Sequence, residues 1–384
     1  MTRSRPRRCG RSRLIDLFVL MMIVAVALVI IPPWLQPQRI YVRQAECMVN
    51  MRNVAQALNA YELTQRHYPG YSNVLKLHDG QIYSDQASGK PRGVSYIIPL
   101  LPYLDEPEVE KVWKDPAATE DQRQGKNVKP NHPRMLNCPT DPPIRNDGWC
   151  ALSYVVNCGM ADISGSAGSP TKPGMPRDWA ANGVFFDLFT GNPLLTGGTA
   201  PVPSGSSNDD FGIYDSSQPG LPMVGMSADY IRRSDGTAYT CLLSENVDAG
   251  RYTDDIESLV GIVWNGSGKV DSSQHPPTLN PPDENMRINV NPGGSELQDT
   301  QARAAGSGGP GSPQWTAFAR PSAFHSGGVN MAFCDGKVRF VSDSMDYYVY
   351  CLLMSSNGAK VKMPGSIKVL PNFDRMPMGS WYIE

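Results

Sequence analysis

The stretch FHSGGVNMAFCDGKVRF, Phe324–Phe340, predicts a β-hairpin. Two short runs, VNMAF and KVRFV, flank the dipeptide Asp335-Gly336. Asp-Gly is a strong hairpin signal, because the tightest hairpin turns need positive φ at their central residues. We therefore expect two antiparallel strands joined at Gly336, with His325 ahead of the first strand.

An apolar segment near the N-terminus, LIDLFVLMMIVAVALVII (Leu14–Ile31), contains one charged residue, Asp16. As a helix its 18 residues would span about 27 Å, enough to cross a thin hydrocarbon layer. Residues 1–13 carry six arginines and no acidic residue, and such positive flanks stay in the cytoplasm. The sequence predicts a basic cytoplasmic leader (1–13), a single transmembrane helix (14–31) and an extracytoplasmic remainder, as in a bacterial inner-membrane protein.

The end of the apolar segment offers no signal-peptidase site. The residues IIPPWLQPQ that close it lack an A-x-A pattern, which favours an uncleaved anchor. The basic residues are concentrated at the N-terminal tip, and the rest of the chain is acidic on balance. This distribution favours the lipid bilayer as partner and argues against nucleic-acid binding.

A second helix is expected beyond the membrane segment. Pro32, Pro33 and Pro37 are expected to break the first helix at the membrane surface. Residues 38–67 then carry an amphipathic pattern, with apolar residues at helical spacing: Met48, Met51, Ala55 and Leu58. Such a stripe predicts a helix that packs its apolar face against a core.

The remaining chain, residues 71–384, has the composition of a strand-rich domain. Short apolar runs alternate with turn residues, and glycine and proline are abundant. Two polar stretches rich in Gly, Pro and Ser, near residues 161–222 and 266–321, are predicted to be long loops. We expect an α+β fold: a transmembrane helix and an amphipathic helix, followed by one β-rich domain. The runs predicted as strands or strand-like pieces are residues 94–104, 151–159, 182–189, 237–246 and 259–265.

The N-terminal region resembles a type IV prepilin leader. The segment GRSRLIDLFVLMMIVAVALVIIPP supplies a basic start, Gly10, the L-I-D triplet with Asp16, and a long apolar helix. The resemblance implies cleavage beside Gly10 and Arg11 by a prepilin peptidase, methylation of the new N-terminus, and packing against like subunits. Relative to the L-I-D triplet, Gly10 lies one residue earlier than in the family pattern, and Arg11 and Arg13 replace small or apolar residues. These departures concern cleavage and methylation. They do not affect the expected membrane anchor.

The resemblance extends to the C-terminal stretch. His325, nine residues and then Asp335-Gly336 form the H-x(9)-DG motif of a large family of bacterial envelope proteins of unknown function with pilin-like anchors. It implies a pilin-like β-rich domain and no established catalytic mechanism. Other phrases similar to that family occur in order: CMVNMRNVAQALNAYE, RHYPG, YIIPLLPYLDE, LNCPTDP, LSYVVNCG and SDGTAYTCLLSEN.

Polar residues of the family motifs are candidates for one site. Glu245, His325, Asn330 and Asp335 are predicted to form a buried polar cluster that ties the hairpin to the LLSEN strand, because buried imidazole and carboxylate groups must be paired. The alternative is a divalent-ion site made by one imidazole and two carboxylates, although calcium prefers oxygen ligands. We expect the structural cluster, with Gly336 in the turn and no bound metal.

Seven of the eight cysteines follow the apolar segment, where an exported location permits disulfides. Cys138, Cys150 and Cys158 are close in sequence, so a disulfide within this group is expected. No C-x-x-C pair occurs, which argues against a structural zinc site.

No known catalytic motif is present in the sequence. GSGGPG (306–311) fits G-x-G-x-x-G but lies in a Pro-rich loop, and G-x-S-x-G and Walker motifs do not occur. We expect no enzyme and no cofactor, but a pilin-like structural or assembly component of the cell envelope. The alternative is a signal-anchored binding protein for a surface polymer or glycan, which would use exposed tryptophans: Trp179, Trp264, Trp315 and Trp381.

Overall fold

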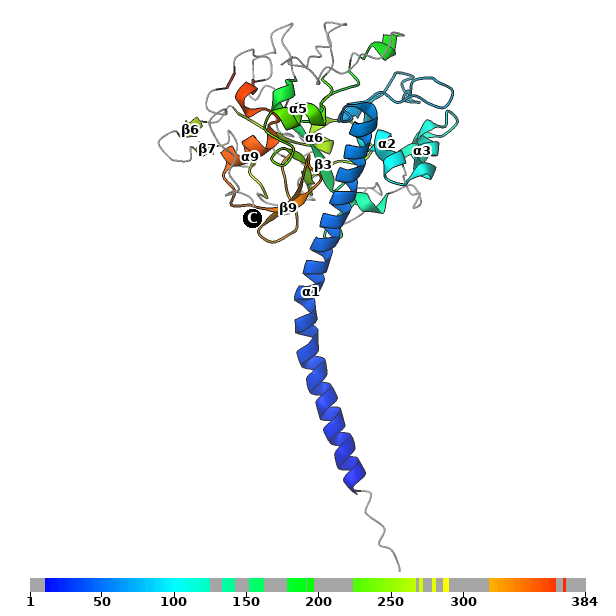
Figure 1. Cartoon of the computed structure of the whole chain (residues 1–384). Helices are drawn as coiled ribbons and strands as arrows, with labels where there is room; N and C mark the ends of the chain where they lie inside the picture. Colours follow the sequence, from blue (N-terminus) through cyan, green and yellow to red (C-terminus); the bar gives the residue numbers. More distant parts are fainter. Residues whose placement is uncertain are drawn as a thin grey trace, which may run out of the picture.

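The protein consists of one long helix and a head of mixed helix and sheet (Figure 1). Helix α1 (Arg11–Gln65) projects from the head with its N-terminal half and packs into the head with its C-terminal half. The computed structural model describes residues 11–124, 133–141, 152–161, 178–190, 192–196, 224–266, 269–271, 278–280, 286–289, 318–363 and 369–370.

The expected break between two helices is wrong. Helix α1 continues through Pro32, Pro33 and Pro37 without interruption. An interior proline removes one backbone hydrogen bond and its ring crowds the carbonyl four residues earlier, which is why a break was expected, although its fixed φ of about −65° is itself helical. The flanking apolar and amphipathic segments therefore remain one helix.

The C-terminal half of α1 packs as its pattern predicts. Met51, Ala55 and Leu58 are completely buried, and Met48 is partly buried against the same core. The helix ends at Gln65, and Arg66 then adopts a positive φ of 67°. The predicted amphipathic face is confirmed within the continuous helix.

A five-stranded sheet forms the centre of the head, in the order β5-β3-β4-β8-β9. Its strands are β3 (Tyr154–Met160), β4 (Cys241–Glu245), β5 (Gly261–Trp264), β8 (Gly328–Phe333) and β9 (Val338–Ser342). Strands β3 and β5 are parallel, whereas the other neighbours are antiparallel. The hairpin predicted around Gly336 is β8–β9, and Gly336 has the required positive φ of 80°.

Helices cover both faces of this sheet. The Tyr154 hydroxyl donates to the Cys47 carbonyl of α1 over 3.2 Å. Three residues later, on the opposite face of β3, the Asn157 amide donates to the Met354 carbonyl of α9 (Tyr347–Met354) over 2.8 Å. Because successive strand residues point to opposite faces, α1 and α9 lie on opposite sides, and every residue of β3 and β4 is buried.

Short elements surround the sheet. The run 94–104, expected as a strand, is a two-residue strand followed by helical turns, and 182–189 forms no strand beyond the Ser72–Asp187 bridge. Apolar runs without alternation fit a buried helix as well as a strand, which explains the first error. Residues 183–189 are instead a mostly buried irregular segment. The remaining helices are α2 (Ile97–Leu100), α3 (Pro107–Lys114), α4 (Glu120–Gln124), α5 (Ala228–Arg233) and α6 (Glu257–Val260). The 3₁₀ segments are η1 (Leu101–Tyr103), η3 (Arg134–Leu136), η4 (Ala180–Asn182), η5 (Pro193–Thr196) and η7 (Gly358–Lys360). Two small sheets pair β1 (Ser72–Asn73) with β2 (Val94–Ser95), and β6 (Lys269–Asp271) with β7 (Thr278–Asn280).

Several predictions concern regions that the structure describes only in part. Much of the two expected loops, 161–222 and 266–321, lies outside the described residues. Within the expected membrane segment, side chains are described for Ile15–Val26. Among the described residues, no helix reaches the length and hydropathy of a membrane span.

The packing of α1 against the sheet can be measured by truncating one buried leucine. We expect Leu58→Ala to lower the free energy of unfolding of the head by about 2–5 kcal/mol, because it leaves a cavity at a fully buried position. Leu63→Ala, at a position 69% exposed on the same helix, is the matched control and should change it by less than about 0.5 kcal/mol. Denaturant titration of the purified full chain measures both, and equal effects would contradict the packing.

Candidate functional site

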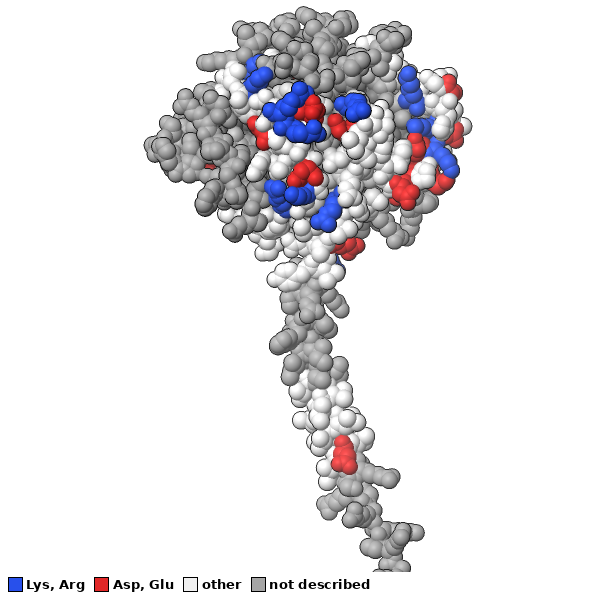
Figure 2. Space-filling view, viewed as in Figure 1, with Lys and Arg blue, Asp and Glu red and all other residues white. Residues whose placement is uncertain are grey.

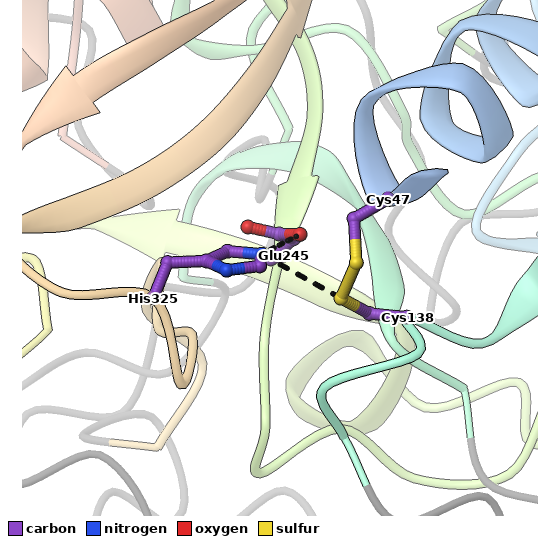
Figure 3. Close-up of side chains that lie close together, drawn as sticks. All are labelled: Cys47, Cys138, Glu245 and His325. Atoms are coloured by element: carbon purple, nitrogen blue, oxygen red, sulfur yellow. Dashed lines mark hydrogen bonds and ion pairs between the residues drawn. A yellow bond between two sulfur atoms is a disulfide. The ribbon is translucent and has the colours of Figure 1, made fainter. Parts of the chain in front are cut away.

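Four side chains from distant parts of the chain converge between α1 and the sheet (Figure 3). Cys47 comes from α1, Cys138 follows η3, Glu245 ends β4, and His325 precedes β8. All four are buried, and their potential metal-ligand atoms lie within 4.8 Å of one another. We call these four residues the junction cluster, because they join α1 to the sheet.

The Glu245 carboxylate is the centre of the hydrogen bonding. Its Oε1 lies 3.0 Å from His325 Nε2 and accepts from the Asn330 side-chain amide at 3.1 Å. Its Oε2 accepts from the Asn330 backbone N–H at 2.8 Å. A carboxylate only accepts hydrogen bonds, so His325 carries the donated proton on Nε2. The predicted association of Glu245, His325 and Asn330 is present in the structure.

The backbone explains why these residues meet. Ser244 of β4 pairs with Met331 of β8 in antiparallel register, so Glu245 lies opposite Asn330. Gly327, with a φ of 82°, turns the chain between His325 and β8. The imidazole thereby reaches back over the end of β4. Two buried polar atoms of this group, His325 Nδ1 and Asn330 Oδ1, have no hydrogen-bond partner in the described part of the chain.

Asp335 does not belong to this cluster. It lies in the β8–β9 turn, where its carboxylate accepts from the Lys337 N–H at 3.0 Å and lies 3.8 Å from the Arg339 guanidinium. A strand rises about 3.3 Å per residue, which separates Asp335 from Asn330 by about 16 Å. The alternative metal site of one imidazole and two carboxylates is therefore not formed. Gly336 contributes to the β8–β9 turn and not to the cluster.

The disulfide differs from the expected one. Cys138 is bonded to Cys47, 91 residues away, and not to a near neighbour. Cys158 is a buried thiol on β3, and Cys150 lies outside the described residues. Sequence proximity was misleading because the segment at Cys138 packs on α1, where the Asn50 amide donates to the Asn137 carbonyl at 3.3 Å.

Cys47 is the site residue that sequence reasoning missed. It precedes Met51, Ala55 and Leu58 by four, eight and eleven residues, so it extends the same apolar stripe of α1. That spacing would have placed it against the head. In the structure Cys138 Sγ also lies 3.6 Å from His325 Nε2, which brings the disulfide into contact with the carboxylate–imidazole pair.

A small hollow opens beside the junction cluster. Its lining includes Cys138, Asp141, Ser153 and Glu245, and its free space is about that of one water molecule. The Ser153 hydroxyl donates to Asp141 at 2.7 Å in its wall. The hollow is too narrow for an organic substrate.

The residues expected to act in processing are separate from this site. Asp16 is exposed on the projecting part of α1. Arg11 begins α1, its side chain is not among those described, and Gly10 lies outside the described residues.

Comparison with known proteins identifies the family but no function. The family described as "Protein of unknown function (DUF1559)", SBP_bac_10, matches residues 36–347. The chain belongs to this family. The matched range contains the whole junction cluster and begins after the leader-like segment. No curated protein and no solved structure matches the chain.

The pairing of Glu245 predicts a large loss of stability when its imidazole partner is removed. We expect His325→Ala to lower the free energy of unfolding by about 3–5 kcal/mol, because a buried carboxylate loses its partner. His78→Ala, at an exposed histidine, is the control and should cost less than about 0.5 kcal/mol. Chemical denaturation measures the stability, and the amount of folded chain in membranes is measured separately. A His325→Ala chain as stable as the wild type would refute the structural role.

Proposed function

We propose that this DUF1559 protein is a membrane-anchored, pilin-like structural or assembly component of the bacterial cell envelope. The N-terminal half of α1 lies in the inner membrane, and the head stands outside the cytoplasm. The observation that carries the proposal is the projecting part of α1 (Figure 1). There apolar side chains are 49–66% exposed: Ile15, Leu17, Phe18, Val19, Leu20, Met21, Met22, Ile23, Val24 and Val26.

A helix that is apolar all around needs an apolar environment. In a globular protein such a helix is buried, and the remaining possibilities are a bilayer or a bundle of similar helices. Helix α1, with 55 residues, is about 80 Å long, far longer than the part that packs on the head. The N-terminal half of α1 does not pack on the head (Figure 1), so it is available to contact lipid and neighbouring subunits.

Charge and covalent chemistry support the orientation. The arginines of residues 1–13 favour a cytoplasmic N-terminus. The Cys47–Cys138 disulfide belongs to the head, and disulfides persist in oxidising compartments outside the cytoplasm. Figure 2 shows basic and acidic side chains mixed over the visible face of the head, without the single-sign surface that nucleic acid attracts.

Asp16 supports assembly in addition to anchoring. A carboxylate in an apolar membrane segment is costly and needs a partner. The resemblance to prepilin leaders supplies one: the N-terminal amine of a neighbouring subunit. Anchoring holds with or without cleavage near Gly10, whereas the pairing of Asp16 with a neighbour's N-terminal amine requires that cleavage, because an uncleaved chain carries its amine at Met1.

The alternative of a polymer-binding protein finds no exposed tryptophan at the two of its four candidate positions that the structure describes. Trp179 and Trp264 are buried, so neither can stack on a sugar ring. Trp315 and Trp381 lie outside the described residues. The exposed apolar helix fits both candidates, whereas Asp16 within that segment favours the assembly component.

Asp16 separates assembly from simple anchoring. We expect the Asp16→Leu chain to remain in carbonate-washed membranes. The amount of cross-linked oligomer should fall at least about tenfold, because the charge pair between neighbouring subunits is lost. Asp16→Glu, which keeps the carboxylate, is the control and should retain them. The assays are alkaline extraction and chemical cross-linking in native membranes. Release of the wild-type chain by carbonate would contradict anchoring, and unchanged cross-linking of Asp16→Leu would contradict assembly.

A further inference from the structure

The junction cluster would supply four ligands to a transition-metal ion once its Cys47–Cys138 disulfide is opened. Two sulfur atoms, one imidazole nitrogen and one carboxylate oxygen lie within 4.8 Å of one another. Thiolate, imidazole and carboxylate are the three ligand types that Zn²⁺ accepts in tetrahedral sites. The four residues are Cys47, Cys138, Glu245 and His325.

We propose that these four residues bind one Zn²⁺ ion whenever Cys47 and Cys138 are thiols, and that the disulfide and the metal are two alternative states of one junction. This inference does not depend on the proposed envelope function. It concerns how α1 is fastened to the head: by a covalent bond to the segment after η3 in one state, and by a metal that also holds Glu245 of β4 in the other.

The distances already approach those of a zinc site. Tetrahedral ligation at typical bond lengths puts a sulfur about 3.6 Å from an imidazole nitrogen and the nitrogen about 3.4 Å from a carboxylate oxygen. The structure has 3.6 Å between Cys138 Sγ and His325 Nε2, and 3.0 Å between Nε2 and Glu245 Oε1. The larger adjustment is at sulfur: the two Sγ atoms must separate to about 3.8 Å, which needs side-chain rotation once the bond is open.

Asn330 is a positioning residue for this site. Its backbone N–H holds Glu245 Oε2 at 2.8 Å, and its side chain holds Oε1 at 3.1 Å. Hydrogen bonds of this kind orient a ligating carboxylate and typically strengthen metal binding by about 10- to 100-fold. Metal binding requires the imidazole to move its proton from Nε2 to Nδ1, which frees Nε2 as a ligand.

The two states interconvert by a balanced reaction. A dithiol reductant gives two electrons and two protons to the Cys47–Cys138 bond, becomes a disulfide itself and leaves two thiols. Zn²⁺ then displaces one proton from each thiol. A newly made chain holds thiols already, so binding needs no reductant at that stage.

The absence of a C-x-x-C pair led sequence reasoning away from zinc. Here the four ligands come from four distant segments, so no local motif exists. The other described free cysteines, Cys158, Cys241, Cys334 and Cys351, are buried and lie outside the four-residue group; burial also raises the pKa of the Cys241, Cys334 and Cys351 thiols. They serve as internal controls.

The test uses the purified full chain in detergent, in disulfide form and after phosphine reduction. Co²⁺ is added first, because tetrahedral thiolate ligation gives it intense visible absorption, and Zn²⁺ is then added to displace it. We expect one metal per reduced chain and none per oxidised chain. Cys334→Ser should bind as the wild type does, whereas Asn330→Ala should weaken binding by about 10- to 100-fold.

A second measurement keeps the proposal falsifiable if variants fold poorly. In the reduced wild-type chain, Zn²⁺ should slow alkylation of Cys47 and Cys138 by at least about tenfold, because metal-bound thiolates are withheld from the reagent. The rate at Cys334 should not change. No metal uptake by the reduced chain, equal uptake by the oxidised chain, or alkylation rates that Zn²⁺ leaves unchanged would overturn the proposal.

Discussion

The buried carboxylate of Glu245 is the constraint on which the rest of the head depends. A charge with 2% of its surface exposed must be satisfied by its neighbours. Asn330 satisfies it from β8, and His325 satisfies it from the segment before β8. These contacts fix how the C-terminal hairpin sits on β4, and the hairpin in turn forms much of the surface that α1 covers.

The disulfide extends this constraint to the stalk. Cys47 lies on the same buried stripe of α1 as Met51 and Leu58, so the covalent bond and the apolar packing act on one helix face. Packing alone lets a helix slide or rotate, whereas a bond to Cys138 beside His325 fixes both. A rigid connection of this kind suits a protein whose stalk packs against neighbours while its head faces outward, which is the role that we propose.

The sequence was most informative where the decisive interactions are local. The β8–β9 hairpin follows from Asp335-Gly336, and the buried face of α1 follows from a 3.6-residue repeat. The partnership of Glu245 with His325 and Asn330 followed from family motifs and the rule that buried charges are paired. Asp335 was misassigned because motif membership says nothing about which end of a strand a residue occupies. The Cys47–Cys138 bond could not be predicted without knowing how α1 packs on the head. The unbroken helix through Pro32 and Pro33 could not be predicted from the local rule that an interior proline disfavours a helix.

The central proposal is that the Cys47–Cys138 disulfide, beside the Glu245–His325 pair, joins α1 to the segment that follows η3, and that the head lies outside the cytoplasm. The most direct test is peptide mapping of the protein extracted from its native membranes, with free thiols blocked before lysis and digests compared with and without reduction. The account predicts a linked pair of peptides that contain Cys47 and Cys138 and that separate on reduction. Recovery of both cysteines as blocked thiols, or linkage of Cys138 to Cys150 or Cys158, would contradict it.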